Sequence, residues 1–376
     1  MEKKPEWKDL IVAWKKFFHL LCIIIIVIGC LNTCAGRGRA PKSVTVYYGP
    51  SDYAKIDQLL DQGSYEEALE FCMDELEKAQ KGSDREMELN ILTGEIYGSY
   101  IGDREQAVLY LEQAIAAARK NQNRSRLADA CYSMSKVYVN LGGDTEEGLE
   151  YAGEAEELYR SEVGENAVET ADAMLNRGLL YFRGEQWENV LESLEPAEAI
   201  LEAGQGIDWY THMCIGIASM KLQKYEKAEE EFLKAKEISQ EEEDDYACAG
   251  SSLWLGELYT DLGEYRKAVD HYEEALEFFR TDTQHPMEKA KIYNNAAYCM
   301  IQESGNWEDG ILYGIRACQA IEETGDTSEE MEAERKDYKQ RLKERYYDEW
   351  KPDATDDEYE EWYQRVVLDG GAWEEE

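Results

Sequence analysis

The sequence predicts an all-α fold built from consecutive helical hairpins. The clearest copy is the stretch Trp254 to Ala275, in which Gly256 lies three residues before Tyr259 and Ala268 lies four residues before Tyr272. Residues three or four apart share one face of a helix. The glycine-containing turn Asp261-Leu-Gly-Glu264 separates the two pairs, so this stretch is predicted to form two antiparallel helices that approach closely at their small residues.

The same arrangement recurs along most of the chain. A small residue is expected to open each second helix, about every forty positions, at Ala68, Ala107, Gly148, Val190, Ala228, Ala268 and Gly310. The turn before this small residue has two forms. The first is represented by Gly63-Ser-Tyr65, and the second by Gly102-Asp103 and Gly143-Asp144. In the second form Asp103 and Asp144 are predicted to cap the following helix by accepting a backbone N–H. About seven hairpins are therefore expected over residues 51–325.

This pattern resembles the tetratricopeptide repeat, with a period longer than the usual one of about 34 residues. It is similar to the extended repeats of kinesin light chains and of bacterial peptide-sensing regulators. The resemblance implies a right-handed solenoid in which the first helix of each hairpin lines a concave binding face.

The N-terminal segment, residues 1–29, has the pattern of an export signal or membrane anchor. Five lysines precede an apolar run from Phe17 to Ile28, which is followed by Gly29 and Cys30. The segment resembles a bacterial lipoprotein signal, which implies cleavage and lipidation at Cys30. The alternative is an uncleaved membrane helix from Phe17 to about Ala35, although the run is short for a span. Residues 30–50 form a tether after cleavage, and in the alternative the tether begins after about Ala35. In either case the body of the protein is expected to be membrane-attached and extracytoplasmic.

After the array, residues 326–350 are predicted to form a capping helix. Thr327 and Glu330 have the spacing of a capping box. An apolar stripe of Met331, Tyr338, Leu342 and Tyr346 would cover the last hairpin. Residues 351–376 form an acidic tail with interspersed aromatic residues, for which we consider two alternatives: a disordered solubilising end, or a segment that folds back onto the array or presents its aromatic residues to a binding partner.

Composition excludes several functions. The formal net charge is -41, which repels phosphate backbones and argues against nucleic-acid binding. The nine cysteines lack CxxC spacing and the four histidines lack the HExxH pattern, so no metal site is predicted. We find no GxSxG, P-loop, GxGxxG or kinase motif, and therefore expect no cofactor and no enzymatic activity.

The expected function is protein interaction. By the resemblance, groove-facing residues flank the small residue of each first helix, which selects Glu95, Tyr132, Lys136, Val139, Leu175, Phe182, Met213, Met220, Leu253, Glu257 and Thr260. This set lacks the Lys/Asn pattern that clamps a terminal carboxylate in some family members. A basic or amphipathic peptide or protein segment is the expected partner. We predict a membrane-anchored interaction scaffold; the alternative is a peptide-sensing regulatory protein.

Overall fold

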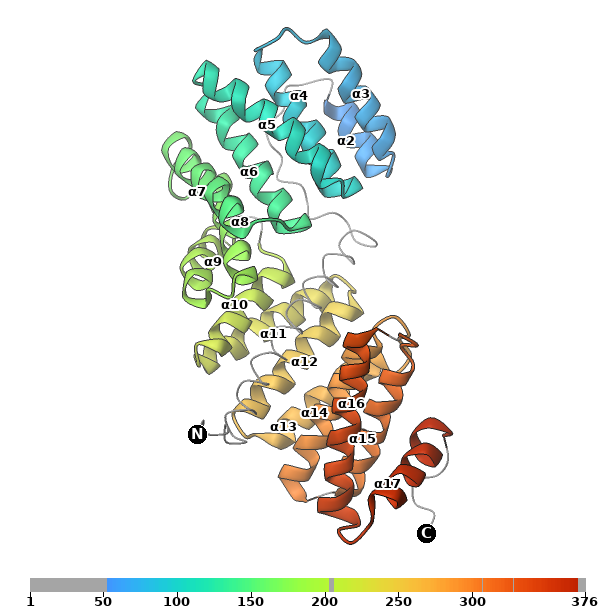
Figure 1. The fold of residues 1–376 in the computed structure, drawn as a ribbon. Coiled ribbons are helices and arrows are strands. Elements are labelled where there is room, and N and C mark those ends of the chain that lie inside the picture. The colour runs from blue at the N-terminus through green and yellow to red at the C-terminus, as the bar shows by residue number, and fades with distance from the viewer. Residues whose placement is uncertain (1–52, 203–205, 306, 327, 371–376) are drawn as a thin grey trace, which may run out of the picture. The chain divides into compact units, whose positions relative to one another are not determined.

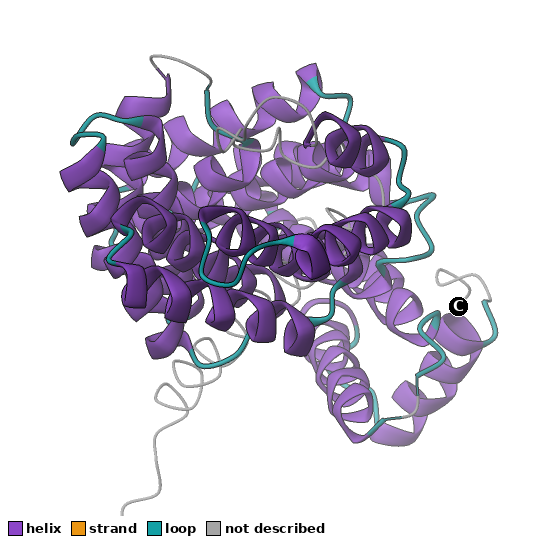
Figure 2. Cartoon of the chain, turned by 90° about the horizontal axis from the view of Figure 1, so that it is seen from above, coloured by secondary structure: helices purple, strands orange, loops and turns teal. Residues whose placement is uncertain are grey.

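The computed structural model describes residues 53–202, 206–305, 307–326 and 328–370 of the chain. Every regular element in these residues is a helix (Figure 1 and Figure 2), which confirms the all-α prediction. The segment 1–29, Cys30 and the tether 30–50 lie outside the described residues. Of the helices that are described, none combines the length and apolar character required to cross a bilayer.

The chain divides into two compact units, which meet in the sequence between Gly206 and Ile207. The repeat region expected as one array therefore falls into two parts, each held together mainly by its own contacts. The first unit contains four hairpins, with helices α2 (Tyr53–Asp61), α3 (Tyr65–Lys78), α4 (Asp84–Glu95) continued by the π-helical turn η1 (Ile96–Ile101), α5 (Arg104–Asn121), α6 (Arg124–Leu141), α7 (Thr145–Glu162), α8 (Val168–Arg183) and α9 (Trp187–Glu202).

The second unit contains three hairpins and a helical end. Its helices are α10 (Trp209–Lys221), α11 (Tyr225–Glu241), α12 (Asp245–Asp261), α13 (Tyr265–Phe279), α14 (Pro286–Ser304), α15 (Trp307–Glu322), α16 (Glu329–Arg345) with η2 (Tyr346–Trp350), and α17 (Asp356–Tyr363) with η3 (Gln364–Leu368). Within each unit a helix packs on the next helix along the chain, as stacked hairpins require.

Six of the seven described hairpins, all but that of α2 and α3, pack tightly because a glycine on one helix accommodates a large side chain from the other. A Cβ added to Gly256 would lie 2.5 Å from the ring of Tyr272, and one added to Gly178 would lie 2.2 Å from Leu194. Gly216 faces Phe232 in the same way. The small residues predicted to open the second helices are buried at all seven positions. The recurring small residues are thus the sites of close helix approach.

The turns and caps follow from their local sequences. The Asp103 carboxylate accepts a hydrogen bond from the backbone N–H of Gln106 at 3.1 Å, and that of Asp144 accepts one from the N–H of Glu146 at 2.9 Å, so both predicted caps are confirmed. Gly263 takes the left-handed conformation (φ 72°) that ends α12. Where Gln223 replaces this glycine, it adopts the same conformation (φ 59°), which a residue with a Cβ disfavours.

The end of the chain packs against the last hairpin. Helix α16 is capped by Ser328, whose hydroxyl accepts from the N–H of Met331 at 3.3 Å. Helix α17 and η3 bury an aromatic and aliphatic face that includes Tyr359, Trp362 and Val366. The Tyr359 hydroxyl donates to the carbonyl of Lys339 at 2.9 Å, which ties α17 to α16. Of the two alternatives for the tail, residues 356–368 therefore adopt the folded one.

Candidate binding pocket of the first unit

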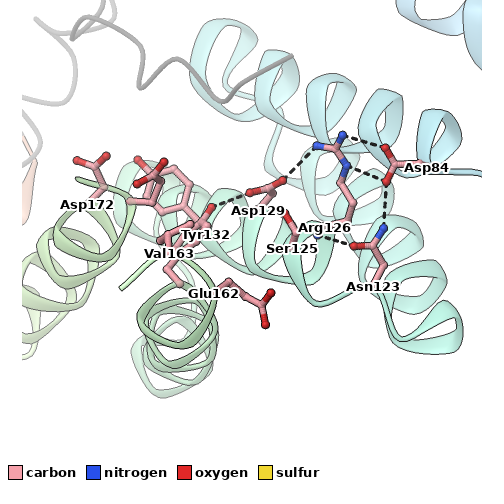
Figure 3. Close-up of a pocket in the computed structure, with 11 residues that line it drawn as sticks. Asp84, Asn123, Ser125, Arg126, Asp129, Tyr132, Glu162, Val163 and Asp172 are labelled. Carbon is pink, nitrogen blue, oxygen red and sulfur yellow. Dashed lines mark hydrogen bonds and ion pairs between the residues drawn. The ribbon is translucent and has the colours of Figure 1, made fainter. Parts of the chain in front are cut away.

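A pocket of about 430 Å³ lies in the first unit, between helices α4, α6, α7 and α8 (Figure 3). This volume is within the range of small-ligand and side-chain sites. Helices α4, α6 and α8 are the first helices of three successive hairpins, and α6 contacts both of the others. The lining residues are Asp84, Asn123, Ser125, Arg126, Asp129, Tyr132, Tyr159, Glu162, Val163, Glu169 and Asp172.

Arg126 forms the centre of an ionic cluster at one side of the pocket. Its Nη2 lies 3.0 Å from Asp84 Oδ2, and its Nη1 lies 3.2 Å from Asp129 Oδ2 (Figure 3). Its Nη2 also lies 3.1 Å from Glu88 Oε1. Burial alone would lower the pKa of Arg126, but the hydrogen bond with Asp84 and the charges of Glu88 and Asp129 raise it. Because three carboxylates surround the guanidinium, Arg126 ties α4 to α6 and has little residual positive charge with which to attract an anion.

Two tyrosines form the wall beside this cluster. The rings of Tyr132 and Tyr159 meet edge to face with centroids 6.3 Å apart, and the Tyr159 hydroxyl donates to Asp129 Oδ1 at 2.9 Å. Burial raises the pKa of the Asp129 carboxyl, although the bonds from Tyr159 and Arg126 oppose the shift. The wall is therefore aromatic, buried and held in place by hydrogen bonds.

The far side of the pocket is acidic. The lining of the whole pocket carries five carboxylates against the single guanidinium of Arg126, and three of them, Glu162, Glu169 and Asp172, lie on this side. At the rim, Glu162 Oε1 pairs with Arg124 Nε at 2.7 Å. Asp172 is 5% exposed, and among the described residues its Oδ2 has no hydrogen-bond partner. Burial and the neighbouring charge of Glu169 raise the pKa of Asp172 to about 7, while Lys136 opposes that shift. Such a lining favours a cationic group over an anion.

The structure places one of the residues predicted for the groove, Tyr132, in the pocket lining. Lys136 is half-buried and acts on Asp172 through its charge, and Leu175 is half-buried on α8. Glu95 accepts a hydrogen bond from the Ser133 hydroxyl at 2.7 Å. In the second unit Glu257 pairs with Lys291 at 2.8 Å, and the Thr260 hydroxyl donates to the carbonyl of Gly256 at 2.7 Å.

The remaining five groove candidates are buried in the helix packing. They are Val139, Phe182, Met213, Met220 and Leu253, each at most 8% exposed. Their side chains therefore offer little surface to a ligand in this structure. The first helices use these positions to pack on their neighbours, because a helix inside a stack contacts other helices on more than one face.

Sequence reasoning missed the acidic lining of the pocket, although a signal for it was present. Glu88, Asp129 and Asp172 each lie six residues before the small residue of their helix, which is Gly94, Ser135 and Gly178 respectively. The same repeat position is therefore acidic in three successive hairpins. Aligning the hairpins on their small residues would have revealed it.

Comparison with known proteins agrees with this architecture. The family model described as tetratricopeptide repeat matches residues 210–281, and the model described as anaphase-promoting complex subunit 5 matches residues 53–140. The fold is a tetratricopeptide-like all-α solenoid.

Two solved structures share this tetratricopeptide-like fold with a TM-score of 0.60 each. One is the apo form of RapI, at 18% identity over 78% of this chain and 84% of that one. The other is a signal transduction ATPase with a tetratricopeptide repeat sensor from Pyrococcus horikoshii, at 17% identity over 76% of this chain. The chain spans 44% of the length of that ATPase.

A curated relative matches locally. Response regulator aspartate phosphatase I of Bacillus subtilis (strain 168) is 45% identical over 56 residues, which are 15% of this chain and 14% of the phosphatase.

Proposed function

We propose that this protein is a membrane-anchored, outward-facing interaction protein that binds a positively charged peptide or protein segment in the pocket of its first unit. The observation that carries the proposal is the acidic, tyrosine-walled pocket formed by α4, α6 and α8, the first helices of successive hairpins, together with α7. An extended segment offers side chains to such a surface at regular intervals, and an acidic lining selects those that are cationic. No step of catalysis is required, and we propose that the protein is not an enzyme.

Selection from a peptide library tests the binding proposal. A phage-displayed library of random dodecapeptides is panned on the immobilised full-length protein, and enriched peptides are resynthesised with arginine or with citrulline, its neutral isostere. We expect enriched peptides to contain Lys or Arg, and citrulline to weaken binding at least tenfold. Hydrogen exchange should show protection in α6 and α8. Enrichment of acidic peptides, or protection confined to residues 207–370, would contradict the proposal.

The anchoring part of the proposal has its own test. Mass spectrometry of the protein extracted from membranes is expected to show an N-terminus at Cys30 that carries lipid. An intact Met1 in the membrane fraction would replace the lipid with an uncleaved anchor. Recovery of the protein from the soluble fraction alone would contradict both forms of attachment.

The second candidate is a peptide-sensing regulatory protein. It is favoured by the local match to a response regulator aspartate phosphatase and by the similarity of fold to RapI. A phosphorylated receiver domain of a response regulator, incubated with the protein, distinguishes the candidates. A regulator of this kind shortens the lifetime of the phosphoryl group or binds the domain, whereas a surface scaffold does neither.

A further inference from the structure

The acidic residues of the pocket follow the repeat. Glu88 on α4, Asp129 on α6 and Asp172 on α8 occupy the same position in three successive first helices, and each is at most 8% exposed. Buried carboxylates are costly unless they are paired. The partner of each one is therefore informative.

The first two carboxylates share one partner. Nη2 of Arg126 contacts Glu88 Oε1 at 3.1 Å and its Nη1 contacts Asp129 Oδ2 at 3.2 Å. Arg126 lies three residues before Asp129, and Arg85 stands in the same place before Glu88. Arg126 supplies the positive charge between Glu88 and Asp129, whereas Arg85 pairs with Glu75 on α3 at 3.3 Å.

The hairpin of α8 and α9 lacks this arginine. The residue three positions before Asp172 is Glu169, so an acidic side chain stands where the two preceding hairpins have arginine. Asp172 Oδ2 is buried and has no hydrogen-bond partner among the described residues (Figure 3). Asp172 and Glu169 both line the pocket. Asp172 therefore lacks the arginine that Asp129 contacts, and the nearby charge of Lys136 acts on it without a hydrogen bond to Oδ2.

We infer that Asp172 is the subsite at which the pocket takes a single cationic group, a guanidinium or primary ammonium supplied by the bound partner. This inference rests on the proposed function and names the chemistry by which the partner is recognised. The incoming cation takes the place at Asp172 that Arg126 takes at Asp129. Glu169 adds a second carboxylate beside it, and Tyr132 forms the aromatic wall.

Binding of a cation at this subsite is coupled to the release of a proton from Asp172. Around Asp172, Glu169 comes from α8, Lys136 and Tyr132 from α6, and Tyr159 and Glu162 from α7. Burial and Glu169 bring the pKa of Asp172 to about 7, so the empty subsite is partly protonated at neutral pH. A cation binds the ionised carboxylate, and the displaced proton passes to solvent. Binding therefore weakens as the pH falls below 7.

The titration of Asp172 tests the inference without reference to any peptide. Full-length protein with ¹³C-labelled Asp carboxyl groups is titrated by NMR, with the Asp172 signal assigned by its loss in Asp172→Asn. The probes are butylguanidinium and its neutral isostere butylurea. We expect butylguanidinium to lower the Asp172 midpoint by at least one pH unit and butylurea to leave it unchanged. A midpoint that responds to neither probe overturns the inference.

Affinity provides the second measurement. Binding of butylguanidinium should fall at least tenfold in Asp172→Asn, and less than twofold in the control Glu157→Gln, which removes the same charge from an exposed position on α7 outside the pocket. Equal affinity in wild type and Asp172→Asn would overturn the inference even if peptides bind. Cation binding at Asp172 together with no peptide enrichment would instead contradict the proposed function. If Asp172→Asn fails to fold, the Asp172 signal is assigned by triple-resonance NMR of the wild-type protein, and the wild-type titration then decides the question.

Discussion

The contact between Gly256 and Tyr272 predicts that one added methyl group destabilises the second unit. In Gly256→Ala the new Cβ would lie 2.5 Å from Tyr272 Cε1 and 2.7 Å from its Cδ1, whereas carbon atoms pack at about 3.5–4.0 Å. Tyr272 is fully buried, and its hydroxyl lies 3.0 Å from that of Thr260, so the ring is held at both ends. The ring or the helix must move by about 1 Å to relieve the clash.

The size of the effect follows from two opposing contributions. Overpacking a core usually costs about 1–3 kcal/mol. Replacing glycine by alanine inside a helix contributes about 1 kcal/mol of stability through helix propensity. The net change expected for Gly256→Ala is therefore between about zero and 2 kcal/mol of destabilisation.

Gly250→Ala is the matched control on the same helix α12. A Cβ at Gly250 would meet no heavy atom within 4 Å, so this variant should gain the propensity contribution alone and become about 1 kcal/mol more stable. Urea unfolding of the full-length protein, followed by far-ultraviolet circular dichroism, measures the difference between the variants, which we expect to be about 1–3 kcal/mol. Equal stability of the two variants would refute the assignment of Gly256 as the site of close helix approach.

Three further predictions concern the pocket and the end of the chain. Asp172→Asn should be more stable than wild type above pH 7, by up to about 4 kcal/mol, because the pKa of Asp172 rises from 3.8 to about 7 on folding. This gain in the free energy of unfolding should shrink as the pH falls from 7 to 4. A difference in urea midpoints that does not change with pH would contradict the prediction. Arg126→Met should cost about 3–5 kcal/mol, since it leaves the buried carboxylates of Glu88 and Asp129 without their cation. Arg124→Met breaks an exposed pair and should cost less than about 1 kcal/mol, and similar losses of stability in both variants would be inconsistent with a buried cluster. Trp362→Ala should destabilise the folded tail by about 3–5 kcal/mol and expose α17 to proteolysis, and an unchanged cleavage rate would argue against its packing.

The features that the sequence predicted are those that depend on neighbours along the chain. Helix-face spacing predicted that Ala268 and Tyr272 lie on one face of α13, where both are buried, and the caps at Asp103 and Asp144 need only the next few residues. The period of small residues also predicted how many hairpins would form. These signals are local because a helical hairpin closes through contacts between residues fewer than about forty positions apart.

Tertiary structure decided the features that depend on several hairpins at once. Val139 and Phe182 lie on the predicted face of their helices, yet they are buried because neighbouring helices cover that face. The packing of residues 356–368 depends on surfaces presented by α15 and α16. The sequence by itself determined that three successive hairpins carry an acidic residue at one position and that Glu169 interrupts the series of arginines. Only the folded chain shows that Asp172 is buried without a hydrogen-bond partner, because its solvation and its neighbours depend on how α6, α7 and α8 pack around it.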